Sequence, residues 1–304
     1  MRSPLLPLKT PSSIVRVLAA CFLLLAAPGC LAVCFRRCVS VSGSLSCPDA
    51  GCTVIPVDEI RSDTQQVSLQ SNVISAVPVL RNCSAVRSMN LAGNNIRHLA
   101  SGAFRACANL RVLNLTDNAI WRLSSDHFAG LGRLQRLYLN RNELTSLESN
   151  LFYRYLSSLQ TLDLSENQIA TLDPNALNDL RHLVSLHLSD NKLTSIETIQ
   201  FLGLESLRNL NLNGNEIENL TIANFVECRS LELLDLSENH LSVIPFQTFI
   251  GLNSLKVLRL NGNRLRSLQS TSLQVPGLQV IYLDDNPLTH LPVGVFPNTT
   301  TAFR

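Results

Sequence analysis

The chain has 304 residues and a formal net charge of +2, and 16% of its residues are charged. That balance lacks the basic excess of a nucleic-acid-binding chain. Aromatic residues make up only 5% of the chain while leucine and asparagine are frequent, which is unusual for an enzyme of mixed elements and favours a short apolar repeat.

The first 32 residues are predicted to be a secretory signal peptide, cleaved after Ala32 or, as a less favoured site, after Gly29. Basic residues precede an apolar run at 17–27, and small residues follow it, which is the order typical of such a signal. An uncleaved signal anchor is the alternative, because residues 17–35 carry no charge and approach the roughly 20 residues that span a membrane. Either reading places the rest of the chain outside the cell, secreted or on the extracellular face of the plasma membrane.

Seven cysteines follow this segment, which fits an oxidising compartment. Because seven is odd, at least one thiol is free or pairs between chains. Four of the seven lie in a segment at 33–63 that we interpret as an N-terminal cap: Cys34, Cys38, Cys47 and Cys52. Cys83, Cys107 and Cys228 occupy equivalent positions of the repeat described next. We interpret them as buried apolar thiols, with a Cys83–Cys107 disulfide as the alternative.

Residues 64–304 repeat one pattern, LxxLxLxxNxL, at intervals of about 24 residues. Nine copies begin at Val86, Leu110, Leu134, Leu159, Leu183, Leu207, Leu231, Leu255 and Leu278, and a weaker copy around Val67 makes ten rungs. Leucines that alternate with polar residues have strand periodicity, and so short a strand is stable only when paired with the same strand of the next rung. The pattern predicts an α/β solenoid: one curved parallel sheet inside, short helical or irregular segments outside.

Two other positions of the rung are filled regularly. An asparagine ends each strand motif, where its amide can donate to and accept from buried peptide groups of stacked rungs: Asn72, Asn94, Asn118, Asn142, Asn167, Asn191, Asn215, Asn239, Asn263 and Asn286. A phenylalanine on the opposite side predicts an apolar spine under the outer face: Phe104, Phe128, Phe152, Phe201, Phe225, Phe249 and Phe296, with Leu177 and Leu273 in the remaining rungs.

Side chains between the strand leucines face solvent on the inner surface, so the core does not dictate them. We predict that ligand contacts come from this set: Arg136, Tyr138, Asp163, His187, Asp235, Arg259 and Tyr282. Tyrosine and arginine are frequent anchors of protein interfaces. The competing interpretation is that these are ordinary solvated strand residues. Acidic residues in the middle of the array disfavour nucleic acid as a partner.

A catalytic function is not expected. Asp163, His187 and Ser189 have the residue types of a hydrolytic triad, but adjacent flat strands offer neither a pocket nor converging amides. No histidine lies near the four N-terminal cysteines, which disfavours a zinc site in a secreted chain. We therefore expect no metal ion and no cofactor.

Four N-x-S/T sequons mark candidate glycosylation sites. We expect glycans at Asn82, Asn219 and Asn298. Asn114 falls on the inner face, where a glycan would block the N-terminal part of the predicted binding surface.

The rung, as in LRNLNLNGNEIENLTIANF at 207–225, resembles the leucine-rich-repeat family in its typical extracellular class. Toll-like receptor ectodomains, small leucine-rich proteoglycans and variable lymphocyte receptors belong to that class. The resemblance covers about residues 34–300 and implies recognition or adhesion, with an extracellular protein or glycan bound on the concave face. A structural matrix role is the alternative, and a homodimer is compatible with either. The family includes proteins that bind nucleic acid, but the acidic middle of this array disfavours that partner here. No second long apolar run occurs, so we expect a membrane link only through an uncleaved anchor or a missing C-terminal segment.

The family also carries an N-terminal disulfide module of the form CxxxCxCx6C. Cys34, Cys38 and Cys47 match its spacing, and Ser40 replaces its third cysteine. The resemblance implies Cys34–Cys47 with Cys38–Cys52, one of three connectivities that four cysteines allow. The family's C-terminal cysteine cap is absent, so we expect either a truncated chain or a last rung covered by a partner.

Overall fold

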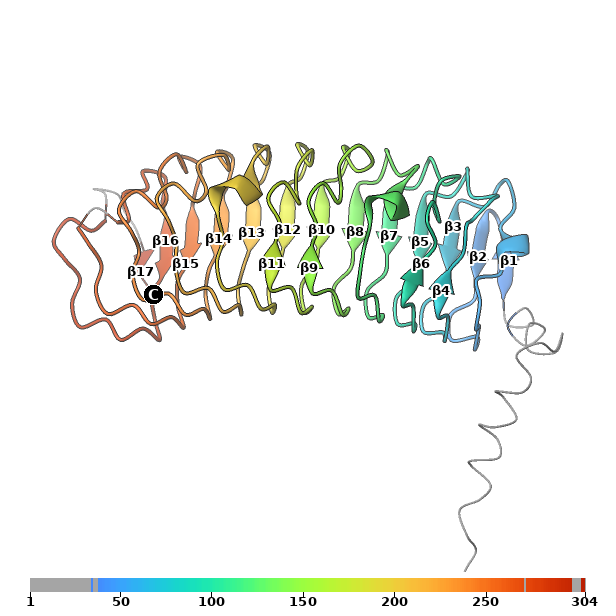
Figure 1. Ribbon diagram of the computed structural model, residues 1–304, viewed down its shortest axis with the longest axis horizontal. Coiled ribbons are helices and arrows are strands. Elements are labelled where there is room, and N and C mark those ends of the chain that lie inside the picture. Colours follow the sequence, from blue (N-terminus) through green and yellow to red (C-terminus); the bar gives the residue numbers. More distant parts are fainter. Residues whose placement is uncertain (1–33, 35–37, 271, 297–301, 304) are drawn as a thin grey trace, which may run out of the picture.

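The computed structural model describes residue 34 and residues 38–270, 272–296 and 302–303. Figure 1 shows an elongated, gently curved row of strands running from β1 to β17. The predicted signal peptide lies outside the described residues. The main sheet consists, in spatial order, of β1 (Val39–Val41), β2 (Ser44–Ser46), β3 (Gln66–Ser68), β5 (Ser88–Asn90), β7 (Val112–Asn114), β8 (Arg136–Tyr138), β10 (Thr161–Asp163), β12 (Ser185–His187), β13 (Asn209–Asn211), β14 (Leu233–Asp235), β15 (Val257–Arg259), β16 (Val280–Tyr282) and β17 (Ala302–Phe303).

The ten predicted rungs correspond to β3 through β16 of this sheet, which confirms the solenoid. Each of these strands pairs in parallel with the next, in register, so that Leu137 lies beside Leu162 and Leu162 beside Leu186. These leucines are fully buried between neighbouring rungs. Beyond the tenth rung the backbone of β17 adds one more parallel strand to β16, so the sheet continues past the point where the repeat pattern ends.

The outer side of the rungs has little regular structure, as expected. Two short parallel pairs form there, β4 (Ala76–Val77) with β6 (His98–Leu99) and β9 (Ser146–Leu147) with β11 (Thr171–Leu172). Among the described residues from 38 onward, the helical elements are three 3-10 turns at η1 (Val57–Glu59), η2 (Ser125–Phe128) and η3 (Thr198–Phe201). A 24-residue rung leaves too little chain for a full helix outside the sheet.

The phenylalanines form the predicted spine beneath this outer side. Phe128 packs on Phe152 with ring centroids 5.5 Å apart, and Phe225 lies between Phe201 and Phe249 at 5.7 and 6.2 Å. All of these rings are buried. The core is therefore one continuous apolar column along the solenoid axis, with leucines on the strand side and phenylalanines on the outer side.

The asparagine ladder links each rung to the one before it. Asn191 is only 6% exposed, and its Nδ2 donates to the carbonyl of Leu188 in its own rung at 3.1 Å and of Leu164 in the preceding rung at 3.0 Å. Its Oδ1 accepts the N–H of Ile169 at 2.9 Å. One side chain thus satisfies backbone groups of two rungs at the turn where strand pairing ends.

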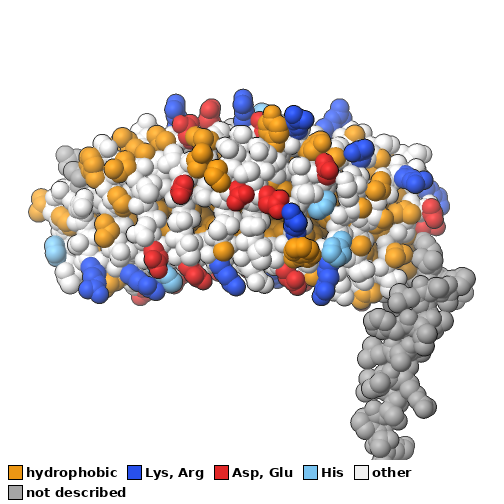
Figure 2. Space-filling view, in the orientation of Figure 1, with side chains coloured by type: hydrophobic (Ala, Val, Ile, Leu, Met, Phe, Trp, Pro, Cys, Tyr) orange, Lys and Arg blue, Asp and Glu red, His pale blue; other side chains and the backbone are white. Residues whose placement is uncertain are grey.

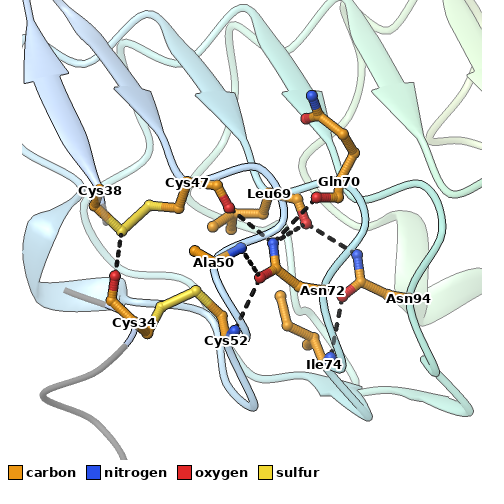
Figure 3. Close-up of a disulfide and its surroundings, with 10 residues drawn as sticks. All are labelled: Cys34, Cys38, Cys47, Ala50, Cys52, Leu69, Gln70, Asn72, Ile74 and Asn94. Atoms are coloured by element: carbon orange, nitrogen blue, oxygen red, sulfur yellow. Dashed lines mark hydrogen bonds between the residues drawn. A yellow bond between two sulfur atoms is a disulfide. The ribbon is translucent and has the colours of Figure 1, made fainter. Parts of the chain in front are cut away.

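The N-terminal cap continues this ladder. The Oδ1 of Asn72 accepts the N–H groups of Ala50 and Cys52 at 3.0 and 2.8 Å, and its Nδ2 donates to the Cys47 carbonyl at 2.8 Å (Figure 3). The cap therefore presents to the first rung the backbone groups that a preceding rung would present.

The disulfide pairing of the cap differs from the pairing that the family resemblance implied. The structure joins Cys34 to Cys52 and Cys38 to Cys47. The antiparallel register of β1 with β2 pairs Val39 with Ser46, so the residues just outside that pair, Cys38 and Cys47, lie opposite each other with Cα atoms 4.3 Å apart. Cys34 is left to pair with Cys52. The expected Cys34–Cys47 and Cys38–Cys52 pairs were therefore wrong.

The interpretation of Cys83 and Cys107 as thiols was also wrong. They occupy the same position on adjacent rungs, which brings their Cα atoms to 4.7 Å, and they form a disulfide. Cys228 matches the expectation of a buried thiol: it is free and fully buried. Burial raises the pKa of the Cys228 thiol to about 12.

We expect Asn191→Ala to lower the free energy of unfolding by about 1–3 kcal/mol, because it leaves buried backbone groups of two rungs without a hydrogen-bond partner. Equilibrium urea denaturation measures this loss. Asn209→Ala is the matched control, since the half-exposed Asn209 makes only a 3.3 Å side-chain bond to Ser185. Equal losses in the two variants would contradict the role of the ladder.

For a protein of residues 33–304 we expect no titratable thiol in the folded state at pH 8 and one after unfolding without reductant. The pKa of Cys228 lies well above this pH, so its reactive thiolate is scarce. A colorimetric thiol titration makes the count. Three thiols after unfolding would show that one of the three disulfides is not formed.

Candidate interaction surface

The inner face of the sheet carries a straight column of side chains, one from each rung. Because the strands are in register, Tyr138 lies beside Asp163 and Asp163 beside His187. Two strands beyond His187, Asp235 lies beside Arg259 and Arg259 beside Tyr282. All the predicted contact residues therefore lie on one face. Arg136 belongs to the neighbouring column, beside Thr161. Whether these residues bind a ligand stays a prediction.

Three of the predicted residues form a linked cluster at the C-terminal end of the face. Arg259 donates from Nη1 to the Asp235 carboxylate at 3.1 Å, and its guanidinium carbon lies 5.4 Å from the centre of the Tyr282 ring. The Asp235 side chain is only 8% exposed. Its carboxylate also accepts the backbone N–H of Ser237 at 3.0 Å. Because a buried carboxylate anchors it, the Arg259 guanidinium is held in place on the surface.

This cluster borders a shallow polar hollow of ≈ 430 Å³ on the inner face. The hollow is lined by Asn211, Asn213, Asp235, Ser237, Arg259, Asn261, Tyr282 and Asp284. The lining residues outside the predicted set come mostly from the turn that follows each strand. The sequence prediction took its contact residues from the strands and so left out these turn residues, although their position recurs two residues after the strand centre in every rung.

The N-terminal group of predicted residues is arranged more loosely. Tyr138 is half-buried and Arg136 is exposed on the same strand. Arg141, which follows in the turn, forms an ion pair with Glu166 at 3.0 Å. The Asp163 carboxylate accepts the N–H and the hydroxyl of Ser165 at 3.0 and 2.6 Å. Among the residues that the structure describes, no hydrogen bond or ion pair connects the side chain of Tyr138 or His187 to another predicted contact residue.

The described residues do not assemble a triad. The Asp163 carboxylate bonds to Ser165, no bond joins it to the His187 ring, and Ser189 is buried. The sulfurs of Cys34, Cys38 and Cys52 lie within 4.8 Å of one another. Each of them belongs to a disulfide, which leaves no thiolate there for a metal ion.

A second hollow, which the sequence did not predict, surrounds the only tryptophan. It measures ≈ 300 Å³ and is lined by Arg97, His98, Leu99, Trp121, Arg122, Leu123, Ser124 and His127. Trp121 is 50% exposed. Burial lowers the pKa of His127, and its Nδ1 accepts the Ser124 N–H at 3.1 Å. This hollow lies at the edge of the rungs beside β6, away from the inner column.

Two of the expected glycosylation sites, Asn82 and Asn219, are exposed. Asn298 lies outside the described residues. Asn114 is half-buried on β7, and its Oδ1 accepts the Thr116 N–H at 3.0 Å. A glycan on Asn114 would attach through Nδ2, so this bond could stay, but the glycan would lie on the inner face.

Figure 2 shows many charged side chains along both long edges of the face in view, and the band between them also carries several acidic, basic and hydrophobic side chains. In the part of the chain that the structure describes, no helix has the length and apolar character needed to cross a membrane.

Comparison with protein families identifies the repeat. A family model described as leucine rich repeat matches residues 84–144, 132–193, 157–217, 181–241, 205–265 and 229–288. A search of curated proteins finds no significant match.

Three solved structures share the fold. In a complex of Latrophilin 3, Unc5D and FLRT2 the matched chain has 25% identity and a TM-score of 0.76 over 85% of this chain and 79% of that one. The functional domain of InlJ from Listeria monocytogenes has 23% identity and a TM-score of 0.63 over 86% of this chain and 52% of that one. The Toll–Spatzle complex of Drosophila contains a chain that matches with 22% identity and a TM-score of 0.68 over 79% of this chain. This chain spans about half of the InlJ domain and 35% of the Drosophila chain.

Proposed function

Because the chain belongs to the leucine-rich-repeat family, we propose that it is an extracellular recognition module that binds a protein partner on its inner face. The observation that supports this most directly is the cluster of Asp235, Arg259 and Tyr282. A tyrosine ring and a guanidinium fixed by a buried carboxylate are pre-ordered interface anchors, so a partner does not have to immobilise them.

An extracellular location is supported by three disulfides in the described residues, which persist in oxidising compartments. One of the similar structures is a complex in which the leucine-rich-repeat part of FLRT2 occurs with Latrophilin 3 and Unc5D. Our proposal includes the signal peptide at 1–32, the cap at 33–63, the solenoid at 64–304 and glycans at Asn82 and Asn219. The protein would be secreted or held at the extracellular face of the plasma membrane, and it would act without catalysis.

The partner would rest on the predicted contact residues from Arg136 to Tyr282, along with the turn residues of the hollow. The seven predicted residues span β8 to β16, long enough for an extended contact. A glycan partner, a homodimer through this face and a structural matrix role are the competing proposals. The polar lining of the hollow is compatible with a glycan, but the anchored Arg259–Tyr282 pair favours a protein.

The test is a screen of the secreted protein against purified extracellular domains, followed by affinity measurements on the hit. We expect Tyr138→Ala with Tyr282→Ala to weaken binding roughly tenfold or more, because it removes the aromatic anchors of both groups. Both rings are only half-buried, so the melting temperature should be kept. Tyr153→Ala, which removes a ring that is 39% exposed on the outer side, is the control and should bind normally. The inner face is rejected as the site if none of the screened domains binds, or if the control and the double variant lose the same affinity.

A further inference from the structure

A third hollow lies at the other edge of the N-terminal rungs, where the chain enters the strands of the inner face. It measures ≈ 300 Å³ and is lined by Gln65, Ala85, Arg87, Asn109, Arg111 and Arg133. Arg87 and Arg111 precede β5 and β7 at equivalent positions, and the Arg111 N–H donates to the Arg87 carbonyl at 2.8 Å. The two guanidinium groups therefore start from neighbouring points on adjacent rungs.

These arginines form no ion pair in the part of the chain that the structure describes. The ion pairs found there involve Arg122, Arg141, Arg208, Lys256 and Arg259, and none includes an arginine of this hollow. All three hollow arginines are exposed. Asp63, two residues before Gln65 in the sequence, forms no ion pair among the described residues.

The hollow is nevertheless organised by hydrogen bonds. Arg133 donates from Nη1 to the Asn109 Oδ1 at 2.5 Å, and Asn109 in turn donates from Nδ2 to the Ser84 carbonyl at 2.8 Å. One nitrogen of the Arg133 fork is thus used to fix the group, and the remaining N–H donors stay available. Gln65 contributes an amide to the same lining.

The surrounding rungs reinforce this positive charge. Residues 64–141 contain nine arginines and only two acids, Asp117 and Asp126, whereas residues 159–296 contain eight basic and fifteen acidic residues. The hollow therefore lies in a basic stretch of rungs, between a cap at 38–63 with one arginine and four acids and later rungs that are acidic. A polyanion approaching this protein is drawn to the N-terminal rungs and repelled from the rest.

We propose that this hollow binds a sulfated polysaccharide through Arg87, Arg111 and Arg133. Guanidinium forks match the paired oxygens of sulfate esters. Adjacent rungs about 4.8 Å apart place the Arg87 and Arg111 side chains at neighbouring positions, and Arg133 lines the same hollow from the next rung. Side-chain amides of Gln65 and Asn109 suit sugar hydroxyl groups. The choice of an extracellular polyanion rests on the proposed extracellular function.

Two other anionic partners fit the lining less well. Ala85 is the only apolar residue of the six described residues that line the hollow, so an acidic peptide would find no pocket for its apolar anchors. None of the six is aromatic, so single-stranded nucleic acid would lack a stacking platform.

The experiment uses the full chain, expressed in a secreting eukaryotic host, with heparin as the probe on a sensor surface. We expect Arg87→Gln, Arg111→Gln and Arg133→Gln together to weaken binding roughly tenfold or more and to flatten its salt dependence. The control is Arg181→Gln, Arg264→Gln and Arg266→Gln, which removes the same charge from exposed arginines without ion pairs among the described residues. This control should stay within about twofold of the parent, since distant charges are screened by salt.

Equal losses in the two triple variants would overturn the proposal, because they would show attraction to net charge alone. Competition by polyglutamate, hyaluronan or single-stranded DNA as strong as that by heparin would overturn it as well, since none of them carries sulfate. If the first triple variant fails to fold, Arg111→Gln alone is measured, and an unchanged heparin affinity then rejects the site. The Tyr138 and Tyr282 double variant should keep heparin binding, so failure of this proposal and failure of the protein-binding proposal give different results.

Discussion

The fold depends on one buried hydrogen-bonding group, the asparagine amide at the end of each strand. At this turn the backbone leaves the sheet, and without the amide its N–H and C=O groups would be buried unpaired. Each amide bonds to its own rung and to the preceding one, as Asn191 does through Leu188, Leu164 and Ile169. The position of every rung is therefore set by its neighbour. The in-register columns of the inner face follow from this link, and so does the way Asn72 seats the cap.

The repeat made most of the fold predictable, because the residues that stack are the residues that recur. The strands, the asparagine ladder, the phenylalanine spine and the inner column of Tyr138, Asp163 and His187 all follow from one period. The cap pairing did not follow, because the β1–β2 register that sets Cys38 against Cys47 is local to a segment outside the repeat. The sequence left the Cys83–Cys107 bond undecided for another reason, because leucine and a thiol fill the same buried position equally well. The hollows were missed because they depend on side-chain lengths in adjacent turns rather than on any one position.

A solenoid of this kind separates the residues that build it from the residues that face a partner. Leucines, asparagines and phenylalanines are held nearly constant from rung to rung, so variation is confined to the surface. Here the variation is graded along the axis: arginine dominates the early rungs and aspartate and glutamate the later ones. The two ends therefore offer different chemistry on the same scaffold. On our two proposals, one chain would contact two unlike partners at once, one at the polar inner face near Tyr282 and the other at the edge near Arg111.

The positions of the disulfides also determine how the molecule responds to a pulling force. Rungs contact only their neighbours, so a stretched solenoid peels from an end and releases the length of one rung at a time. The disulfides close loops within 34–52 and across 83–107, and the chain inside these loops cannot be drawn out. The rungs after residue 107 contain no such bond among the described residues. Tension applied through the two termini would therefore extend the rungs after residue 107 and leave the chain inside the two disulfide loops unextended, so the resistance of the protein to stretching differs between its two ends.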